Sequence, residues 1–144
     1  MIVFVFLLGC SKKEWVHTLQ GSSEHWEASM DIKPVDDPDV EAVFVGKIKL
    51  KTPVTLKSAQ YEAQVRNGSP GGDLRHDLEK LQNFETVQIF STYAHSATKP
   101  TFHQNMPEKE LASMFSDLTF QMTWEDENGQ HVEEILLDTI IMGK

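Results

Sequence analysis

Residues 26–33 read Trp-Glu-Ala-Ser-Met-Asp-Ile-Lys, and apolar and polar side chains alternate through the whole stretch. A period of two is typical of a β-strand with one buried face, because successive side chains of a strand point to opposite sides. The stretch therefore predicts a strand that buries Trp26, Ala28, Met30 and Ile32 in a core and turns its other face to water.

The same period recurs along the chain on both sides of turn signals. Further strands are predicted from alternation or β-rich composition over residues 42–50, 59–65, 84–93, 118–124 and 131–141. Val43 and Val45 add apolar residues on the second face of their strand, which predicts that its first half is covered on both sides. Asn128-Gly129 is typical of a tight hairpin turn, so the last two strands should pair.

One segment changes period. Pro107-Glu108-Lys109-Glu110 suits the first turn of a helix, and Leu111, Met114, Phe115 and Leu118 follow at spacings of three and four residues. We expect one short helix near residues 107–115. Many short strands, frequent turns and this helix predict a mainly β protein, a single antiparallel β-sandwich with an immunoglobulin-like arrangement. The Cys-Trp-Cys spacing of antibody domains is absent from the sequence.

Length and charge limit what the chain can be. Its 144 residues are enough for one domain with its own core, and no linker or repeat divides residues 15–144. The formal net charge of −9 repels phosphate backbones, so nucleic acid is not an expected partner. The charge also disfavours adsorption to an anionic membrane, and no apolar run is long enough for a spanning helix.

The beginning of the chain offers another means of attachment. Residues 1–10 read Met-Ile-Val-Phe-Val-Phe-Leu-Leu-Gly-Cys, an apolar run that ends in the one cysteine of the sequence. This resembles a bacterial lipobox, in which an aliphatic residue, a small or aliphatic residue and Gly or Ala precede a lipidated Cys. Leu7, Leu8, Gly9 and Cys10 match these positions in order, and Leu8 is the least typical of them.

The resemblance implies that the Cys10 thiol receives a diacylglyceryl group and that cleavage follows Gly9. Two or three acyl chains, palmitate among them, anchor a protein stably where one chain does not. We therefore expect a signal peptide over residues 1–9, a lipidated tether over residues 10–14 and the sandwich over residues 15–144. The membrane is then a partner through the lipid, and the domain lies at the cell membrane on its extracytoplasmic face.

One feature departs from the signal-peptide pattern. No Lys or Arg precedes Cys10, although signal peptides begin with a basic segment. This favours a natural start upstream of Met1. The alternative is that residues 2–8 form a buried N-terminal strand and that Cys10 is an ordinary buried thiol.

A second resemblance covers the residues after the cysteine. Residues 15–26 place a Gly-Ser turn between two tryptophans, and a third tryptophan, Trp124, lies in the predicted C-terminal hairpin. In these features the chain resembles a group of small lipoproteins of Gram-positive bacilli. The resemblance implies a β-sandwich and a surface location, and it implies no reaction.

Two patterns resemble catalytic or metal-binding sites. Residues 96–99, Ser-Ala-Thr-Lys, have the Ser-x-x-Lys spacing of penicillin-binding enzymes, but Pro100 ends any helix there and the partner motifs are missing. Asp73, His76 and Asp77 would share one side of a helical turn and would suit a weak metal or acid–base site. A solvated turn explains these three residues better.

Two acidic loops are candidates for weak calcium binding. Residues 36–39 are Asp-Asp-Pro-Asp, and residues 125–129 are Glu-Asp-Glu-Asn-Gly, which departs from the EF-hand pattern because Trp124 stands where an Asp is required. A charged hairpin tip explains residues 125–129 equally well, and a simple exposed loop explains residues 36–39 better.

The histidines and tryptophans show no site spacing. His17, His25, His76, His95, His103 and His131 form no zinc motif, and most of them should lie at the surface. His17 and His25 would meet only in one particular strand register. Trp15, Trp26 and Trp124 fit a core better than an aromatic ligand platform.

We therefore assign no catalytic, cofactor-binding or metal-ligating residue from the sequence, and Cys10 is the one predicted site, for lipidation. The expected function is that of a non-enzymatic binding or structural module, with an envelope protein as the candidate partner. The alternative is a small cell-envelope enzyme or metal-dependent factor whose groups only the fold brings together.

Overall fold

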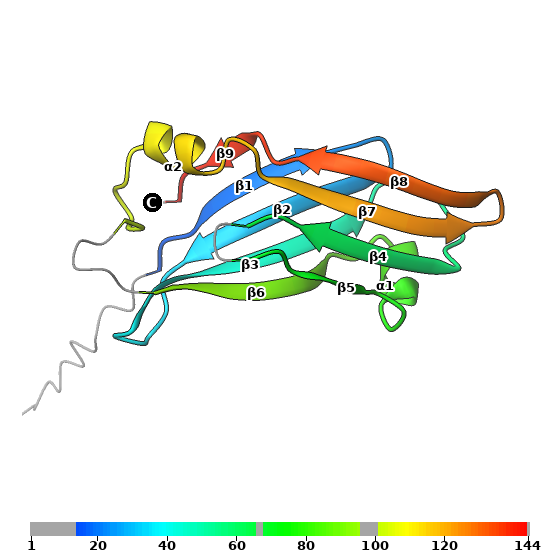
Figure 1. The fold of residues 1–144 in the computed structure, drawn as a ribbon, viewed down its shortest axis with the longest axis horizontal. Helices are drawn as coiled ribbons and strands as arrows, with labels where there is room; N and C mark the ends of the chain where they lie inside the picture. The colour runs from blue at the N-terminus through cyan, green and yellow to red at the C-terminus, as the bar shows by residue number, and fades with distance from the viewer. Residues whose placement is uncertain (1–13, 66–67, 96–100, 144) are drawn as a thin grey trace, which may run out of the picture.

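Two antiparallel β-sheets stacked face to face form the body of the protein (Figure 1). The computed structural model describes residues 14–65, 68–95 and 101–143. Cys10, the apolar run of residues 2–8 and the Ser-x-x-Lys segment at residues 96–99 lie outside the described residues.

The first sheet has five strands in the order β6-β3-β2-β1-β9. Their bounds are β1 His17–Ser22, β2 Trp26–Lys33, β3 Val40–Leu50, β6 Val87–His95 and β9 Thr139–Ile141. In the register of β2 and β3, Trp26 lies opposite Leu50 and Ile32 lies opposite Phe44. The apolar residues that alternate along β2 and β3 therefore lie on the same face of the sheet, as the sequence pattern predicts.

The second sheet has four strands in the order β5-β4-β7-β8. Their bounds are β4 Ser58–Ala63, β5 Gly71–Asp73, β7 Thr119–Asp126 and β8 Gly129–Leu136. The predicted hairpin joins β7 to β8, where Asp126 pairs with Gly129 across Glu127 and Asn128. Gly129 takes a φ of +114°, which glycine adopts at little cost and which explains its place in the turn.

Large aromatic side chains fill the space between the sheets. Trp26 and Trp124 meet edge to face with ring centroids 5.7 Å apart, and Phe90 and Phe120 do the same at 5.5 Å. Tyr61 of β4 links the sheets with a hydrogen bond of 2.6 Å from its hydroxyl to the Ile89 carbonyl of β6. The tryptophans predicted to be core residues are all buried: Trp15, Trp26 and Trp124. This confirms the core interpretation over a ligand platform.

The middle of β3 allows close packing because it carries a glycine. The Phe90 ring lies directly over Gly46, and a Cβ there would lie 2.1 Å from a ring atom. Val43 and Val45, on the other face of β3, are also buried, which confirms the prediction that this half of the strand is covered on both sides.

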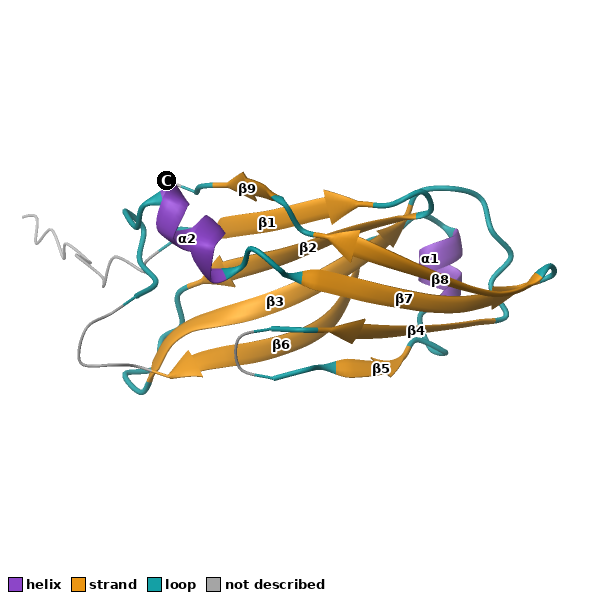
Figure 2. Cartoon of the chain, turned by 45° about the horizontal axis from the view of Figure 1, so that its top comes forward, coloured by secondary structure: helices purple, strands orange, loops and turns teal. Residues whose placement is uncertain are grey.

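Two short helices flank the sheets (Figure 2). The predicted helix near residues 107–115 is confirmed as α2, Glu108–Met114, which buries Leu111 completely. The second helix, α1, Leu78–Gln82, was not predicted, because five residues are too few to show a helical period. Its one buried residue, Leu81, docks it against the core.

The described residues thus confirm a mainly β, antiparallel sandwich. The immunoglobulin-like arrangement is not confirmed. The chain forms β1, β2 and β3 as consecutive neighbours in one sheet before it crosses to the other sheet at β4.

Candidate functional site

The two ends of the sandwich differ in what they carry. The chain enters the fold at Glu14 and Trp15, at the end where α2 lies (Figure 1). The opposite end carries residues 23–25 between β1 and β2 and the hairpin between β7 and β8. We call the first the entry end and the second the distal end.

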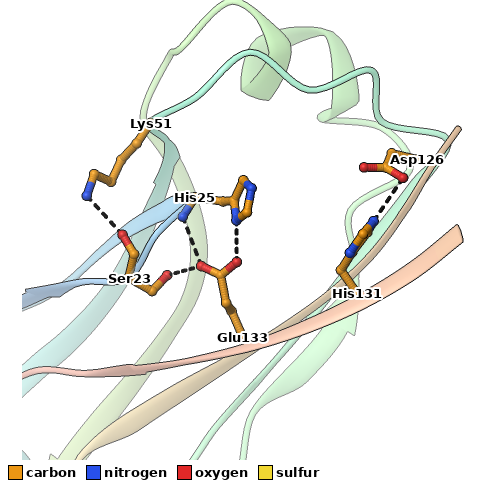
Figure 3. A network of polar contacts seen from close by, with 6 residues as sticks. All are labelled: Ser23, His25, Lys51, Asp126, His131 and Glu133. Atoms are coloured by element: carbon orange, nitrogen blue, oxygen red, sulfur yellow. Dashed lines mark hydrogen bonds and ion pairs between the residues drawn. The ribbon is translucent and has the colours of Figure 1, made fainter. Parts of the chain in front are cut away.

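At the distal end, the Glu133 carboxylate holds the turn between β1 and β2 (Figure 3). One oxygen, Oε1, accepts hydrogen bonds from the Ser23 hydroxyl at 2.5 Å and from the His25 backbone N–H at 2.9 Å. The other oxygen, Oε2, faces Nδ1 of the His25 ring at 2.5 Å. Three donors thus converge on one carboxylate, which fixes both the carboxylate and the turn.

These donors also decide the charge of the carboxylate. Burial by itself raises the pKa of Glu133, but hydrogen bonds from Ser23 and from the backbone and ring of His25, together with the positive charge of His25, outweigh burial. The pKa of Glu133 therefore lies below its ordinary value, and the group is ionised at neutral pH.

Lys51 completes the support of the turn. Its backbone N–H donates to the His25 carbonyl at 2.7 Å, and its Nζ donates to the Ser23 carbonyl at 2.9 Å. The carbonyls of Ser23 and His25 are therefore held by Lys51, directly after β3, while Glu133 of β8 holds the Ser23 hydroxyl and the N–H and ring of His25. Figure 3 shows the Lys51 ammonium group and the Glu133 carboxylate on either side of the turn.

A second acid–imidazole pair lies beside the first. Nε2 of His131 is 2.9 Å from Oδ1 of Asp126, which also accepts the Asn128 backbone N–H at 2.8 Å. The hydrogen bond from His131 is the main reason that the pKa of Asp126 lies below its ordinary value.

The two imidazoles flank one indole. The Trp124 ring lies 5.3 Å from the His25 ring and 5.2 Å from the His131 ring, and it stacks on the latter. Neither Nε1 of Trp124 nor Nε1 of Trp26 has a hydrogen-bond partner among the described residues.

Ser23, His25 and Glu133 are the residue types of a hydrolytic triad, but their arrangement is different. In such a triad the imidazole lies between the hydroxyl and the acid, so that it can take the hydroxyl proton. Here the acid lies between the other two groups, and the Ser23 hydroxyl donates to the carboxylate instead of to the imidazole. The arrangement orients a turn, and its hydrogen-bond order differs from that of a Ser-His-acid triad.

Glu24, at the tip of the same turn, brings a second carboxylate to this place. Glu24, His25 and Glu133 each offer one ligand atom, and these three atoms lie within 4.8 Å of one another. Glu24 is exposed and makes no hydrogen bond or ion pair with the described residues. It is the one group of the three without a structural task in the turn.

A polar groove of about 640 Å³ runs over the outer face of the five-stranded sheet and begins beside this turn. Its lining combines hydroxyl, amide, cationic and acidic groups, among them Gln20, Ser29, Lys47, Lys49, Glu134 and Thr139. Lys47 is fixed there by an ion pair of 2.7 Å with Asp31. The groove can therefore present both charges and hydroxyls to a polar ligand.

A second cavity, of about 600 Å³, lies at the entry end and is more apolar. Trp15, Val35, Val40 and Phe102 contribute to its lining. The Glu41 carboxylate beside it accepts the backbone N–H groups of Thr101 and Phe102 and so fixes one wall.

The structure places the sequence candidates as follows. Asp73 accepts hydrogen bonds from the backbone and side chain of Arg75, and Asp73, His76 and Asp77 form no ligand cluster within the described part of the chain. In the acidic loop after β2, Asp37 accepts the Asp39 N–H at 2.8 Å, which is an ordinary turn contact. Of the six histidines, His76, His95 and His103 are exposed, and His25 and His131 are half-buried. His17 is fully buried, in the phase of Leu19.

His17 and His25 do not meet, because the register pairs His17 with Ile32 at the far end of the β1–β2 hairpin. The importance of Glu133 was missed. The available signal was its phase: His131, Glu133 and Ile135 share one face of β8, so two ionisable side chains point inward from an edge strand.

Comparison with known proteins adds no relative: no family model, curated protein or solved structure matches this chain. Within the residues that the structure describes, no helix is long and apolar enough to cross a membrane.

Proposed function

We propose that this chain is a lipid-anchored extracytoplasmic module that binds a polar ligand or an envelope partner without catalysing a reaction. The proposal depends on one observation, the lipobox-like sequence Leu7-Leu8-Gly9-Cys10 with the single thiol of the chain at its end. A lipid on that thiol would restrict the domain to a membrane surface.

The geometry of the fold supports the same proposal. Only the short segment from Cys10 to Glu14 separates the thiol from Trp15, which is buried at the entry end. An anchor there leaves the distal end directed away from the bilayer. The distal cluster, formed by Ser23, His25 and Glu133, would then be open to partners in the envelope.

The proposal that the chain binds without catalysing a reaction is supported by the arrangement around Glu133 and by the groove. The Ser23 hydroxyl is committed to a carboxylate, and the groove offers polar contacts from Lys47, Lys49 and Glu134 along a sheet face. Polar groups that line one groove can fix the orientation of a ligand.

The proposed lipid anchor and membrane location are tested by metabolic labelling with a fatty-acid analogue in a bacterial host. We expect label on the wild-type chain and none on Cys10→Ala, while Ser11→Ala, a matched change beside it, keeps the label. Protease added to intact cells, after removal of the wall or outer membrane, should then digest the labelled protein. A chain that stays unlabelled, or that resists protease until the cells are lysed, contradicts the proposal.

The binding role is tested by photocrosslinking in cells. A photoreactive residue at Ser29, in the groove, should give one dominant adduct with an envelope component, and one at Gln60, exposed on the other sheet, should not. If the purified chain instead hydrolysed an envelope substrate and lost that activity in Ser23→Ala or His25→Ala, the non-enzymatic proposal would be wrong.

A further inference from the structure

We infer that the distal end binds a divalent transition-metal ion, zinc first of all, through Glu24, His25 and Glu133. The three side chains come from the β1–β2 turn and from β8, which are far apart in the sequence and adjacent in the fold. Their ligand atoms, one per residue, already lie within 4.8 Å of one another.

The Glu133 carboxylate is oriented in the manner of a metal ligand. Two donors, the Ser23 hydroxyl and the His25 N–H, hold Oε1 from behind. This leaves Oε2 directed at Nδ1 of His25, with a single hydrogen between the two atoms (Figure 3). Ligating carboxylates are commonly positioned by such outer hydrogen bonds, which fix the free oxygen toward the ion.

The charges around Glu24, His25 and Glu133 favour the binding of a cation. Glu24 and Glu133 bring two carboxylates to one imidazole, and Glu24 has no partner among the described residues. Lys51, whose ammonium group is in the same network, donates to the Ser23 carbonyl and to neither carboxylate. A divalent ion would neutralise both carboxylates, which a single imidazolium cannot do.

One nitrogen and two carboxylate oxygens are ligand types that zinc accepts at about 2.0–2.2 Å, and an open zinc site has three protein ligands plus water. The 2.5 Å gap between Nδ1 and Oε2 suits a hydrogen atom. An ion entering between them must widen the gap and displace this hydrogen from Nδ1, which leaves Nε2 as the protonated nitrogen of the ring. Because the Glu24 side chain is exposed, it can move toward the ion and supply the third ligand.

The experiment is calorimetric titration of zinc chloride into the full-length chain carrying Cys10→Ala, which removes the one thiol. We expect one saturable site per chain. Glu24→Gln should weaken binding about tenfold or more. The matched control Glu27→Gln, an exposed glutamate on β2, should leave the affinity unchanged.

A second readout identifies the nitrogen ligand without relying on affinity. Copper(II) bound at the same place should show electron-spin coupling to one imidazole in Cys10→Ala and none when His25→Gln is added. Coupling that survives His25→Gln would assign the metal to other histidines and overturn the inference. Absence of saturable zinc binding, or equal affinities of Glu24→Gln and Glu27→Gln, would overturn it as well.

Discussion

The two ends of the sandwich use inward-pointing histidines for opposite purposes. At the entry end, His17 of β1 is fully buried, and both ring nitrogens are bonded to backbone groups. At the distal end, the side chains of His25 and His131 are 28% and 36% exposed, and both face carboxylates. Histidine is therefore a neutral structural residue at the entry end and part of a charged cluster at the distal end.

The hydrogen bonds define the state of His17. Its Nδ1 accepts the Gly143 backbone N–H at 3.1 Å, so the proton must be on Nε2, which donates to the His103 carbonyl at 2.9 Å. Gly143 can approach only because it lacks a side chain, since a Cβ there would lie 1.8 Å from the Val16 carbonyl oxygen. His17 thus joins β1 to two later segments of the chain.

The comparison teaches that burial and partner type must be considered together. Backbone partners fix one neutral tautomer, and full burial excludes water, so His17 has no further group to bind. At the partly exposed distal end, the carboxylate partners leave negative charge to which a ligand can bind. Changes at the two ends should therefore differ in size and in their dependence on pH.

The largest effect is expected for His17→Ala. The change removes two buried hydrogen bonds and leaves a cavity beside Trp15, whose ring centroid is 4.8 Å from that of His17. We expect a loss of about 2–4 kcal/mol in the free energy of unfolding. Urea denaturation followed by tryptophan fluorescence measures it.

His103→Ala is the matched control for this variant, because the backbone carbonyl of His103 accepts the bond and its side chain is exposed. The control should change the free energy of unfolding by less than about 0.5 kcal/mol. Equal losses in the two variants would show that His17 does not join the segments as described.

A smaller effect is expected for Glu133→Gln at the distal end. The amide keeps the shape of the side chain but loses the charge that receives three donors, and its NH₂ group opposes the His25 ring. We expect a loss of about 1–2 kcal/mol in the free energy of unfolding at neutral pH, since the side chain is only partly buried. Glu134→Gln, on the exposed face of β8, should be close to neutral.

The pH dependence of stability should separate these two glutamate variants. The pKa of Glu133 is lower in the folded chain than its ordinary value of 4.5. Its contribution is therefore present above that value and is lost as the pH falls through the lower folded pKa. Wild type and Glu134→Gln should lose more stability than Glu133→Gln when urea denaturation is repeated between about pH 6 and pH 3. Parallel curves for all three proteins would contradict the charged role of Glu133.

The sequence predicted the parts of the molecule that depend on local periodicity. Trp26 to Ile32 and Phe120 to Trp124 lie on buried faces because the side-chain period of a strand is independent of distant residues. His17 is buried by its phase in β1, and its burial was missed because no strand was predicted over residues 17–22. The lipidation of Cys10 remains a prediction from the sequence.

The distal cluster was not predictable in the same way. Ser23 and Glu133 are separated by 110 positions, and they meet only because β8 lies at the edge of one sheet beneath the β1–β2 turn of the other. No spacing rule covers a contact that depends on how two sheets stack. Inward polar residues on an amphipathic edge strand are the local sign that such a contact exists.

The smallest effect on stability is expected for Glu24→Gln in the absence of metal. Glu24 is exposed and makes no polar contact with the described residues, and its charge lies near that of Glu133. Its removal should leave the free energy of unfolding unchanged or raise it slightly, by less than about 0.5 kcal/mol, because two like charges no longer repel. With zinc present, urea denaturation should show the opposite order, since a ligand that binds only the folded chain stabilises wild type more than this variant. If Glu24→Gln were as destabilising as Glu133→Gln without metal, Glu24 would belong to the structure of the turn, and the contrast between a bonded glutamate and a free one would disappear.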